Sequence, residues 1–418
     1  MDILIILIAI YCSGYYYATT AAGSSFSTIL LGLGIVILFC RMIRIKKNES
    51  EATVLVSRGK LALACYLIAV ILITGIFRTG FSGVATKQIL ITILALLITG
   101  VYSWDEFRQA FVKAMVVISV LSLAGLIIIQ TPLANRFPTI VNYNNQTFLS
   151  GIFFSGLKYT YTGLTNRLQG LFWEPGLFAS YLSLAMILLK TENKREYWLT
   201  QILFIVCLVL SRSGAGIAMI PMIFITIIAD KSEEKLSGKA RIILTGLAVL
   251  LFILAQYGSG IIEVWINSNF TMKVLNVTNI SNYTRINAVL VDLEIAQENL
   301  PFGIGIGGYA DEVARYSSAM ASSGTSTFTT YLAEYGILGV PIIFFWIRSI
   351  FRLSGRKGFL SIIATAVLML SILTKEPHGN LLFMNCIFMY KAIEDDARRE
   401  QEEDIDSETT IQETEPGI

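Results

Sequence analysis

The chain alternates long apolar runs with short polar segments, and most of the runs are long enough to cross a bilayer. A membrane-spanning helix needs roughly 20 predominantly apolar residues. The pattern therefore predicts an all-α, polytopic integral membrane protein with about twelve spanning helices. The expected spans are residues 3–22, 26–43, 61–78, 87–103, 111–130, 172–190, 197–211, 214–230, 241–258, 336–353, 358–375 and 378–393.

Composition supports the membrane assignment and excludes several kinds of site. Hydrophobic residues make up 54% of the 418 residues and charged residues only 15%, which is far from the composition of a soluble domain. All the cysteines lie in apolar runs, so we expect neither a disulfide framework nor a thiolate metal site. His378 is the only histidine, which excludes a multi-histidine centre. We therefore expect no metal, no cofactor and no nucleic-acid partner.

The basic residues give the chain a direction across the membrane, because cytoplasmic loops are enriched in Lys and Arg. Alternation from a cytoplasmic N-terminus leaves less than a third of the 32 Lys and Arg residues outside. Both termini are then cytoplasmic, and two long connections, 131–171 and 259–335, are external. Residues 1–393 would form a single membrane domain. The acidic segment 394–418 is expected to be a disordered cytoplasmic tail.

One polar line, residues 166–179, stands immediately before an apolar run. Within it, Glu174-Pro175 predicts a helix start, because proline at the first helical position leaves no N–H unpaired. An acid beside it faces the positive end of the helix dipole. Arg167, Trp173 and Glu174 would thus place a cation, an aromatic ring and an anion at the mouth of a buried helix.

Arginine is prominent among the cations on the predicted external side, and its planar fork suits bidentate contact with phosphate. Arg212 lies in a very short turn between two expected spans, near the depth of lipid phosphates. Arg285 opens an expected amphipathic helix, 283–298. Together with Arg167, these side chains could hold one lipid pyrophosphate. The alternative is that each reaches to lipid headgroups or caps a helix.

Two stretches resemble the bacterial O-antigen polymerase and O-antigen ligase superfamily, which includes the Wzy-type polymerases. The first is residues 167–176, Arg-Leu-Gln-Gly-Leu-Phe-Trp-Glu-Pro-Gly, and the second extends from Arg285 to Gly339. In the ligases the late external loop carries a His-Asn/Ser/Gln pair before Gly-x-x-Gly, and here the spacing from Ser326 fits. The histidine position holds Thr325, which cannot act as a base, so the resemblance favours a polymerase over a ligase.

Carboxylates at the external helix ends are candidate bases toward an acceptor hydroxyl. They are Glu174, Glu334 and Glu376, and His378 beside the last has the more suitable unperturbed pKa. The candidate catalytic residues are therefore Glu174, Glu334 and His378. The alternative is that each glutamate is a helix N-terminal acid neutralised by a neighbouring arginine.

Two further patterns in the second external loop do not predict ligand sites. The glycine-rich run 303–308 follows no strand and opens no βαβ unit, so we expect a turn that packs closely on the membrane domain. Asp292-x-Glu294 is no metal motif on a helix, because those side chains do not face each other. In the expected helix 283–298, the residues Ile286, Val289, Leu290 and Leu293 would form the apolar face.

The resemblance implies a GT-C-like, metal-independent glycosyltransferase in the bacterial cytoplasmic membrane. It would polymerise oligosaccharide repeat units linked to undecaprenyl or another polyprenyl pyrophosphate, at the outer leaflet, for O-antigen, capsule or exopolysaccharide. Its partners would be that lipid-linked oligosaccharide, membrane lipid, a flippase and a chain-length regulator. The alternatives are an O-antigen ligase with another acceptor, a transporter or flippase for the lipid-linked unit, and a non-catalytic membrane partner.

Overall fold

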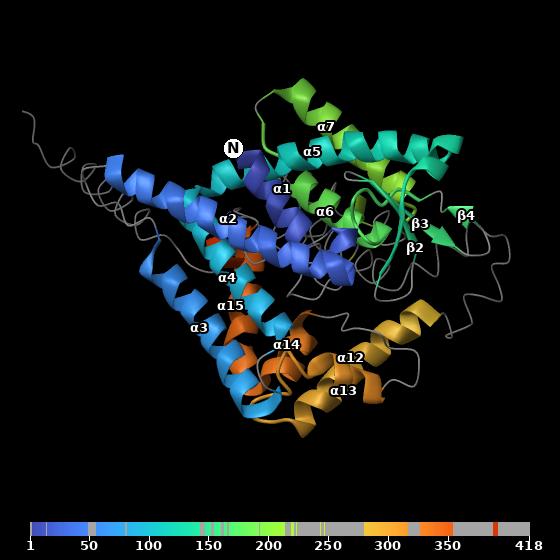
Figure 1. The fold of residues 1–418 in the computed structure, drawn as a ribbon. Coiled ribbons are helices and arrows are strands. Elements are labelled where there is room, and N and C mark those ends of the chain that lie inside the picture. Colours follow the sequence, from blue (N-terminus) through green and yellow to red (C-terminus); the bar gives the residue numbers. More distant parts are fainter. Residues whose placement is uncertain are drawn as a thin grey trace, which may run out of the picture.

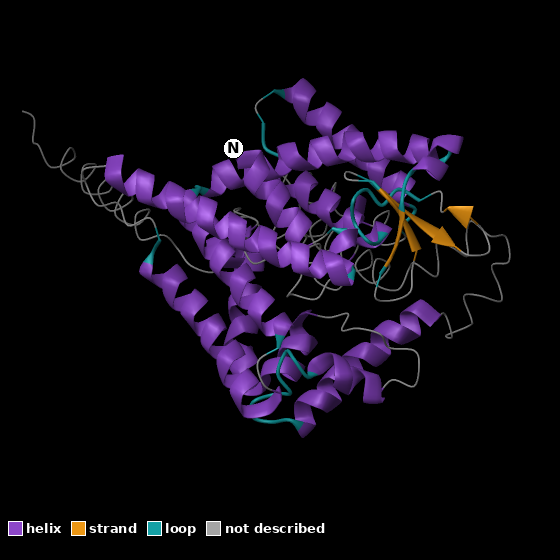
Figure 2. Ribbon diagram, viewed as in Figure 1, coloured by secondary structure: helices purple, strands orange, loops and turns teal. Residues whose placement is uncertain are grey.

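The computed structural model of the chain is mostly helical (Figures 1 and 2). It describes residues 2–13, 15–48, 56–79, 82–142, 147–151, 154–159, 163–164, 167–191, 193–213, 219–220, 280–316, 327–353 and 388–391, and the single positions 223, 243 and 246. The expected spans 214–230, 241–258, 358–375 and 378–393 lie wholly or mostly outside these residues, as does the predicted tail.

The described helices are long and follow the predicted apolar runs. Their bounds are α1 Asp2–Ser13, α2 Ala21–Asn48, α3 Arg58–Thr74, α4 Gly83–Val101, α5 Trp104–Ile129, α6 Pro175–Leu188, α7 Lys194–Ser211, α12 Ile280–Glu298, α13 Tyr309–Tyr316, α14 Thr327–Tyr335 and α15 Gly339–Leu353. Shorter turns of helix are η1 Tyr16–Thr19, η2 Gly75–Thr79, η3 Pro132–Arg136 and η4 Gly336–Leu338.

Membrane-spanning segments are confirmed within the described residues. By length and composition, 5 helices there can cross a membrane, namely Ala22–Lys47, Arg58–Arg78, Gly83–Val101, Trp104–Ile129 and Phe328–Leu353. The protein is therefore a multi-pass membrane protein, whereas twelve spans and a GT-C-like fold stay predictions. Several spans begin earlier than the apolar runs predict, because Ser57, Ser82 and Ser103 cap α3, α4 and α5 and add a polar first turn.

The first expected span, 3–22, was wrong as a continuous helix. Instead, α1 ends at Ser13, the turn η1 follows, and α2 begins at Ala21. The cause is a long-range contact that propensity does not register. The backbone N–H of Tyr16 donates to the carbonyl of Leu171 at 3.0 Å, and Tyr15 forms a β-bridge with Phe172.

A small antiparallel sheet occupies the first of the two loops predicted to be external, and it is an addition to the predicted all-α fold. Its strands are β1 Thr139–Val141, β2 Thr147–Ser150, β3 Ser155–Tyr159 and β4 Gly163–Leu164, paired in the order β1-β2-β3-β4. Phe148 and Leu149 on β2 are buried, which fixes the sheet on the helices below it. The sheet lies where α5 ends and α2 begins (Figure 1), and we call this end of the bundle the sheet end.

Cations and aromatic rings gather at the opposite end of the bundle, which we call the basic end. Cation–ring contacts form there between Arg41 and Tyr102 (4.5 Å), Lys60 and Tyr390 (5.2 Å), and Lys391 and Trp104 (4.1 Å). These residues come from the end of α2, the start of α3, the α4–α5 turn and the last described helical turn. Predicted cytoplasmic segments thus meet at one end, while the membrane's sidedness stays a prediction.

The second loop that is predicted to be external contributes α12 and α13, which pack against α14. The expected amphipathic helix exists, but its predicted apolar face was wrong. Leu290 and Leu293 are 58% and 44% exposed, whereas Val291 and Ile295 are buried with α13 and α14. The side chain of Ile286 lies outside what the structure describes.

The glycine-rich run packs closely on the end of α14, as predicted. The backbone N–H groups of Ile304 and Gly305 donate to the carbonyls of Ala333 and Glu334 at 2.9 and 2.8 Å. Gly303 has a positive φ of 71°, and a Cβ there would lie 2.5 Å from the backbone of Glu334. Only glycine allows this approach.

Candidate functional site

Arg167 lies against the C-terminus of α7. Its Nε donates to the carbonyl of Ser211 at 3.2 Å and its Nη2 donates to the carbonyl of Arg212 at 3.1 Å. The backbone N–H of the next residue, Leu168, donates to the carbonyl of Leu210 at 3.0 Å. Arg167 therefore caps the C-terminus of α7, because it donates to carbonyls that have no partner within the helix.

Arg212 is the C-cap of α7 and takes the left-handed conformation, with φ 48° and ψ 31°. Its side chain is exposed. This conformation ends the helix at Arg212. Arg167 and Arg212 are thus direct neighbours, although 45 positions separate them in the sequence.

Glu174 lies close to the same turn. It is the N-cap of α6, with extended backbone dihedrals and Pro175 at the first helical position, as predicted. A Cβ on Gly176 would lie 3.1 Å from Oε1 of Glu174 and 3.8 Å from Oγ of Ser213. The Glu174 carboxylate and the Ser213 hydroxyl therefore lie close together around Gly176, where the absence of a side chain leaves them room.

A cluster of buried polar groups lies within and beside residues 167–176, and the sequence did not predict it. Gln169 is 1% exposed, and its Nε2 donates to Oγ of Ser155 at 2.8 Å. Oγ of Ser155 in turn lies 3.0 Å from the carbonyls of Gly170 and Phe172. Gly170 has a positive φ of 59°, and a Cβ there would meet a side-chain hydroxyl at 2.7 Å. The adjacent glutamine and glycine inside an otherwise apolar stretch were the signals available in the sequence.

The other predicted members of the pyrophosphate and catalytic sets are less completely placed. Arg285 lies in α12, and its side chain is outside what the structure describes. His378, Glu376 and the Thr325-Ser326 pair fall outside the described residues altogether. The convergence of Arg285 with Arg167 and Arg212 therefore stays a prediction.

Glu334 belongs to a second polar cluster, which lies between α12, α13 and α14. It is 5% exposed, and Asp292 beside it on α12 is 1% exposed. The Asp292 carboxylate accepts hydrogen bonds from Tyr309 at 2.6 Å, Thr329 at 2.7 Å and Thr330 at 3.2 Å. Asp292 thus connects α12 and α13 to α14, where a membrane span begins.

Burial raises the pKa of the Asp292 carboxyl above its ordinary value, because desolvation disfavours the charged form. The hydroxyls that donate to it lower the pKa, and the charge of Glu334 raises it further. Glu294, two residues along α12, is exposed on the other side of the helix. The two acids of Asp292-x-Glu294 therefore do not face each other, as expected for a helix.

The arrangement at α6 and α7 gives a compact set of groups suited to an anionic ligand. The Arg167 guanidinium, the Glu174 carboxylate and the Ser213 hydroxyl lie around the turn at Arg212, whose own side chain is exposed. Among the residues that the structure describes, no group of three or more His, Cys, Asp or Glu side chains is placed to hold a metal ion. No known family model and no curated protein sequence matches this chain.

Proposed function

We propose that the protein is a glycosyltransferase that polymerises polyprenyl-pyrophosphate-linked oligosaccharide repeat units at the outer leaflet. The observation that carries the proposal is the contact of the Arg167 guanidinium with the Arg212 backbone, close to Glu174. Arg167 and Glu174 come from the segment that leads into α6, and Arg212 is the C-cap of α7. Their chemistry suits a lipid-bound diphosphate next to a hydroxyl that must lose a proton.

In the proposed reaction, the bond between the anomeric carbon and a pyrophosphate oxygen breaks. A new bond forms between that carbon and the hydroxyl oxygen of the non-reducing end of a second lipid-linked unit. The hydroxyl proton passes to a carboxylate, for which Glu174 is the described candidate, and polyprenyl pyrophosphate leaves. Arg212, held in position by Arg167, would stabilise the charge that develops on the leaving group.

Under this proposal Arg167 has a positioning role. Its bonds to the carbonyls of Ser211 and Arg212 engage one edge of its guanidinium and hold the turn in place. Arg212 is exposed and is therefore the side chain we assign to direct contact with the pyrophosphate.

The decisive experiment gives purified protein, in nanodiscs, a single lipid-linked repeat unit and looks for products by gel electrophoresis. A ladder that grows by whole repeats supports the polymerase. We expect Arg212→Ala to lower the rate about 10²–10³-fold, the loss typical of one oxyanion-stabilising donor. A ladder of normal rate from Arg212→Ala would overturn the assignment.

The same assay separates the alternatives. Transfer of the glycan to a different lipid acceptor without a ladder selects the ligase. Movement of the intact lipid-linked unit across the bilayer, with no new glycosidic bond, selects the transporter. A parallel reaction with EDTA tests the expected metal independence, since a sharp loss of product on chelation would contradict it.

A further inference from the structure

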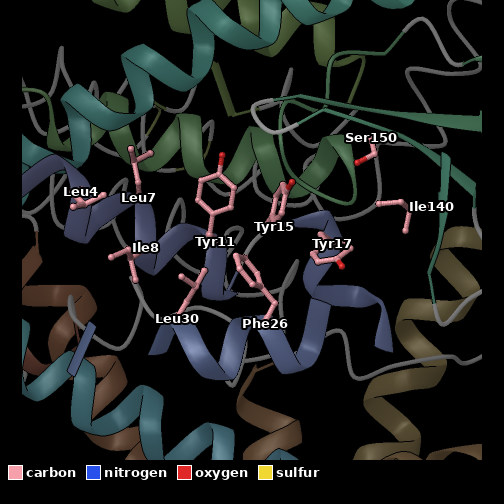
Figure 3. A pocket seen from close by; sticks show the side chains of 10 residues that line it. All are labelled: Leu4, Leu7, Ile8, Tyr11, Tyr15, Tyr17, Phe26, Leu30, Ile140 and Ser150. Carbon is pink, nitrogen blue, oxygen red and sulfur yellow. The ribbon is translucent and has the colours of Figure 1, made fainter. Parts of the chain in front are cut away.

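A groove of about 590 Å³ opens between α1, α2 and the sheet. That volume is within the range of sites that hold small ligands. The side chains that line it are Leu4, Leu7, Ile8, Tyr11, Tyr15, Tyr17, Phe26, Leu30, Ile140 and Ser150 (Figure 3).

The groove changes character along its length. On α1 its lining runs from Leu4 past Leu7 and Ile8 to Tyr11, a distance of about 10 Å at the helical rise of 1.5 Å per residue. This part is aliphatic from Leu4 to Ile8 and becomes aromatic at Tyr11. Beyond it, Tyr15, Tyr17 and Ser150 bring hydroxyl groups to the sheet end (Figure 3). Such a gradient matches a lipid whose chain lies along α1 and whose polar part lies at the sheet end.

The groove is continuous with the lipid-facing surface of α2. Only 22% of the apolar window of this span is buried, so most of its surface is available to lipid. Phe26 lines the groove and is 44% exposed, and Ile29 and Leu33 beyond it are 69% and 49% exposed. A hydrocarbon chain can therefore pass from the bilayer into the groove without crossing a polar surface.

The polar end of the groove adjoins the candidate site. Tyr15 lines the groove and forms the β-bridge with Phe172. Tyr16 bonds through its backbone N–H to Leu171 and through its hydroxyl to Ser150, another lining residue. The segment that carries Arg167 and Glu174 is thus built directly onto the groove wall.

We propose that this groove holds the prenyl chain of the lipid-linked donor, an inference that rests on the proposed function for the identity of the lipid. Among the lining residues that the structure describes, none carries a charge. The pyrophosphate of the donor therefore lies outside the groove, on the side of the arginines. A single groove also suits a lipid with one chain for each head group, whereas a phospholipid would leave its second chain outside.

The test compares two donors that carry the same glycan, one on a long and one on a short prenyl chain. The groove lowers the KM of the long-chain donor. Leu30→Trp fills the groove, so we expect it to raise that KM about tenfold, toward the value for the short-chain donor, with kcat unchanged. Leu61→Trp makes the same substitution at an exposed leucine of α3, outside the lining, and should behave as the wild type.

Photo-crosslinking gives a readout that does not need turnover. A prenyl phosphate with a diazirine at the chain end, in nanodiscs, should label peptides from α1 or α2 in the wild type and in Leu61→Trp, and lose that label in Leu30→Trp. Labelling confined to other helices, or label and KM unchanged in Leu30→Trp, overturns the proposal. A diazirine phosphatidylethanolamine that labels the groove without competition from prenyl phosphate also overturns it.

These outcomes are distinguishable from failure of the proposed function. If the wild type makes no ladder from either donor, the polymerase assignment fails while the crosslinks still report the occupant of the groove. If Arg212→Ala abolishes the ladder and Leu30→Trp leaves both donors unchanged, the groove assignment fails alone.

Discussion

At the scale of single residues, Arg167 and Arg212 show what a sequence can and cannot reveal. Both were recognisable as arginines at external helix ends, where phosphate contact and helix capping compete as explanations. The structure gives Arg167 a capping role through the carbonyls of Ser211 and Arg212. This capping role depends on a contact between residues 45 positions apart, which no local pattern records.

The left-handed conformation of Arg212 allows stability and activity to be separated. An L-residue in this conformation costs about 1–2 kcal/mol relative to the right-handed one, and glycine avoids most of that cost. We expect Arg212→Gly to raise the free energy of unfolding by about 1 kcal/mol while it abolishes polymer formation. Thermal unfolding in detergent and the ladder assay measure the two effects.

Arg212→Lys is the control for this substitution, because it keeps both the charge and the backbone conformation. It should leave the thermal midpoint unchanged and impair the ladder, since a point charge lacks the fork geometry. Full activity in Arg212→Gly would remove Arg212 from the site.

Asp292 gives a prediction on pH. Burial raises its pKa in the folded state, so the folded protein holds the proton more tightly than the unfolded chain. Its contribution to stability is therefore largest at low pH and is lost as pH rises through the folded-state pKa. Asp292→Asn resembles the protonated form and should make stability less dependent on pH above about pH 4, the ordinary pKa of an aspartate carboxyl. Unfolding midpoints across that range measure the effect, and exposed Glu294→Gln should leave the wild-type profile unchanged.

At the scale of elements, helix existence was predictable and helix orientation was not. The spacing of Leu290 and Leu293 correctly predicts an amphipathic α12, but it does not tell which medium each face meets. The buried face instead contains Asp292, whose carboxylate is satisfied by hydroxyls from α13 and α14. A polar residue can be the most buried one when its partners come from other elements.

The turn that joins α12 to α13 depends on glycine at one position. We expect Gly303→Ala to destabilise the protein by about 2 kcal/mol or more, because the backbone is left-handed there and the new Cβ meets the backbone of Glu334. Gly32→Ala on α2 is the matched control. A Cβ at Gly32 meets nothing within 4 Å, so this change should stabilise the helix by about 1 kcal/mol. Equal thermal midpoints for the two variants would contradict the close packing.

At the scale of the whole molecule, the alternation of apolar runs and basic clusters predicted which helix ends lie together. The sheet was not predicted, because its strands are only 2 to 5 residues long and its segment has no clear alternation. Tyr15 and Tyr16 interrupt the first expected span through contacts with segments more than 100 positions away, which a local pattern does not record.

The sidedness of the bundle can be measured with single cysteines in a cysteine-free background. Thr139 on β1 and Asn193 at the start of α7 are both exposed and lie at opposite ends of the bundle. We expect an impermeant maleimide to label Thr139→Cys in intact cells, and Asn193→Cys only after the membrane is opened. The reverse pattern would invert the predicted topology.

The contact of Tyr390 with the α4–α5 turn has a consequence for biosynthesis. Its hydroxyl donates to the carbonyl of Tyr102 at 2.8 Å, across 288 positions of chain. The ribosome releases the first of these partners long before it makes the second. The early helices are therefore inserted in the membrane before this contact can form. A nascent chain that stalls before residue 390 would lack the contact and would be exposed to the membrane's quality-control proteases.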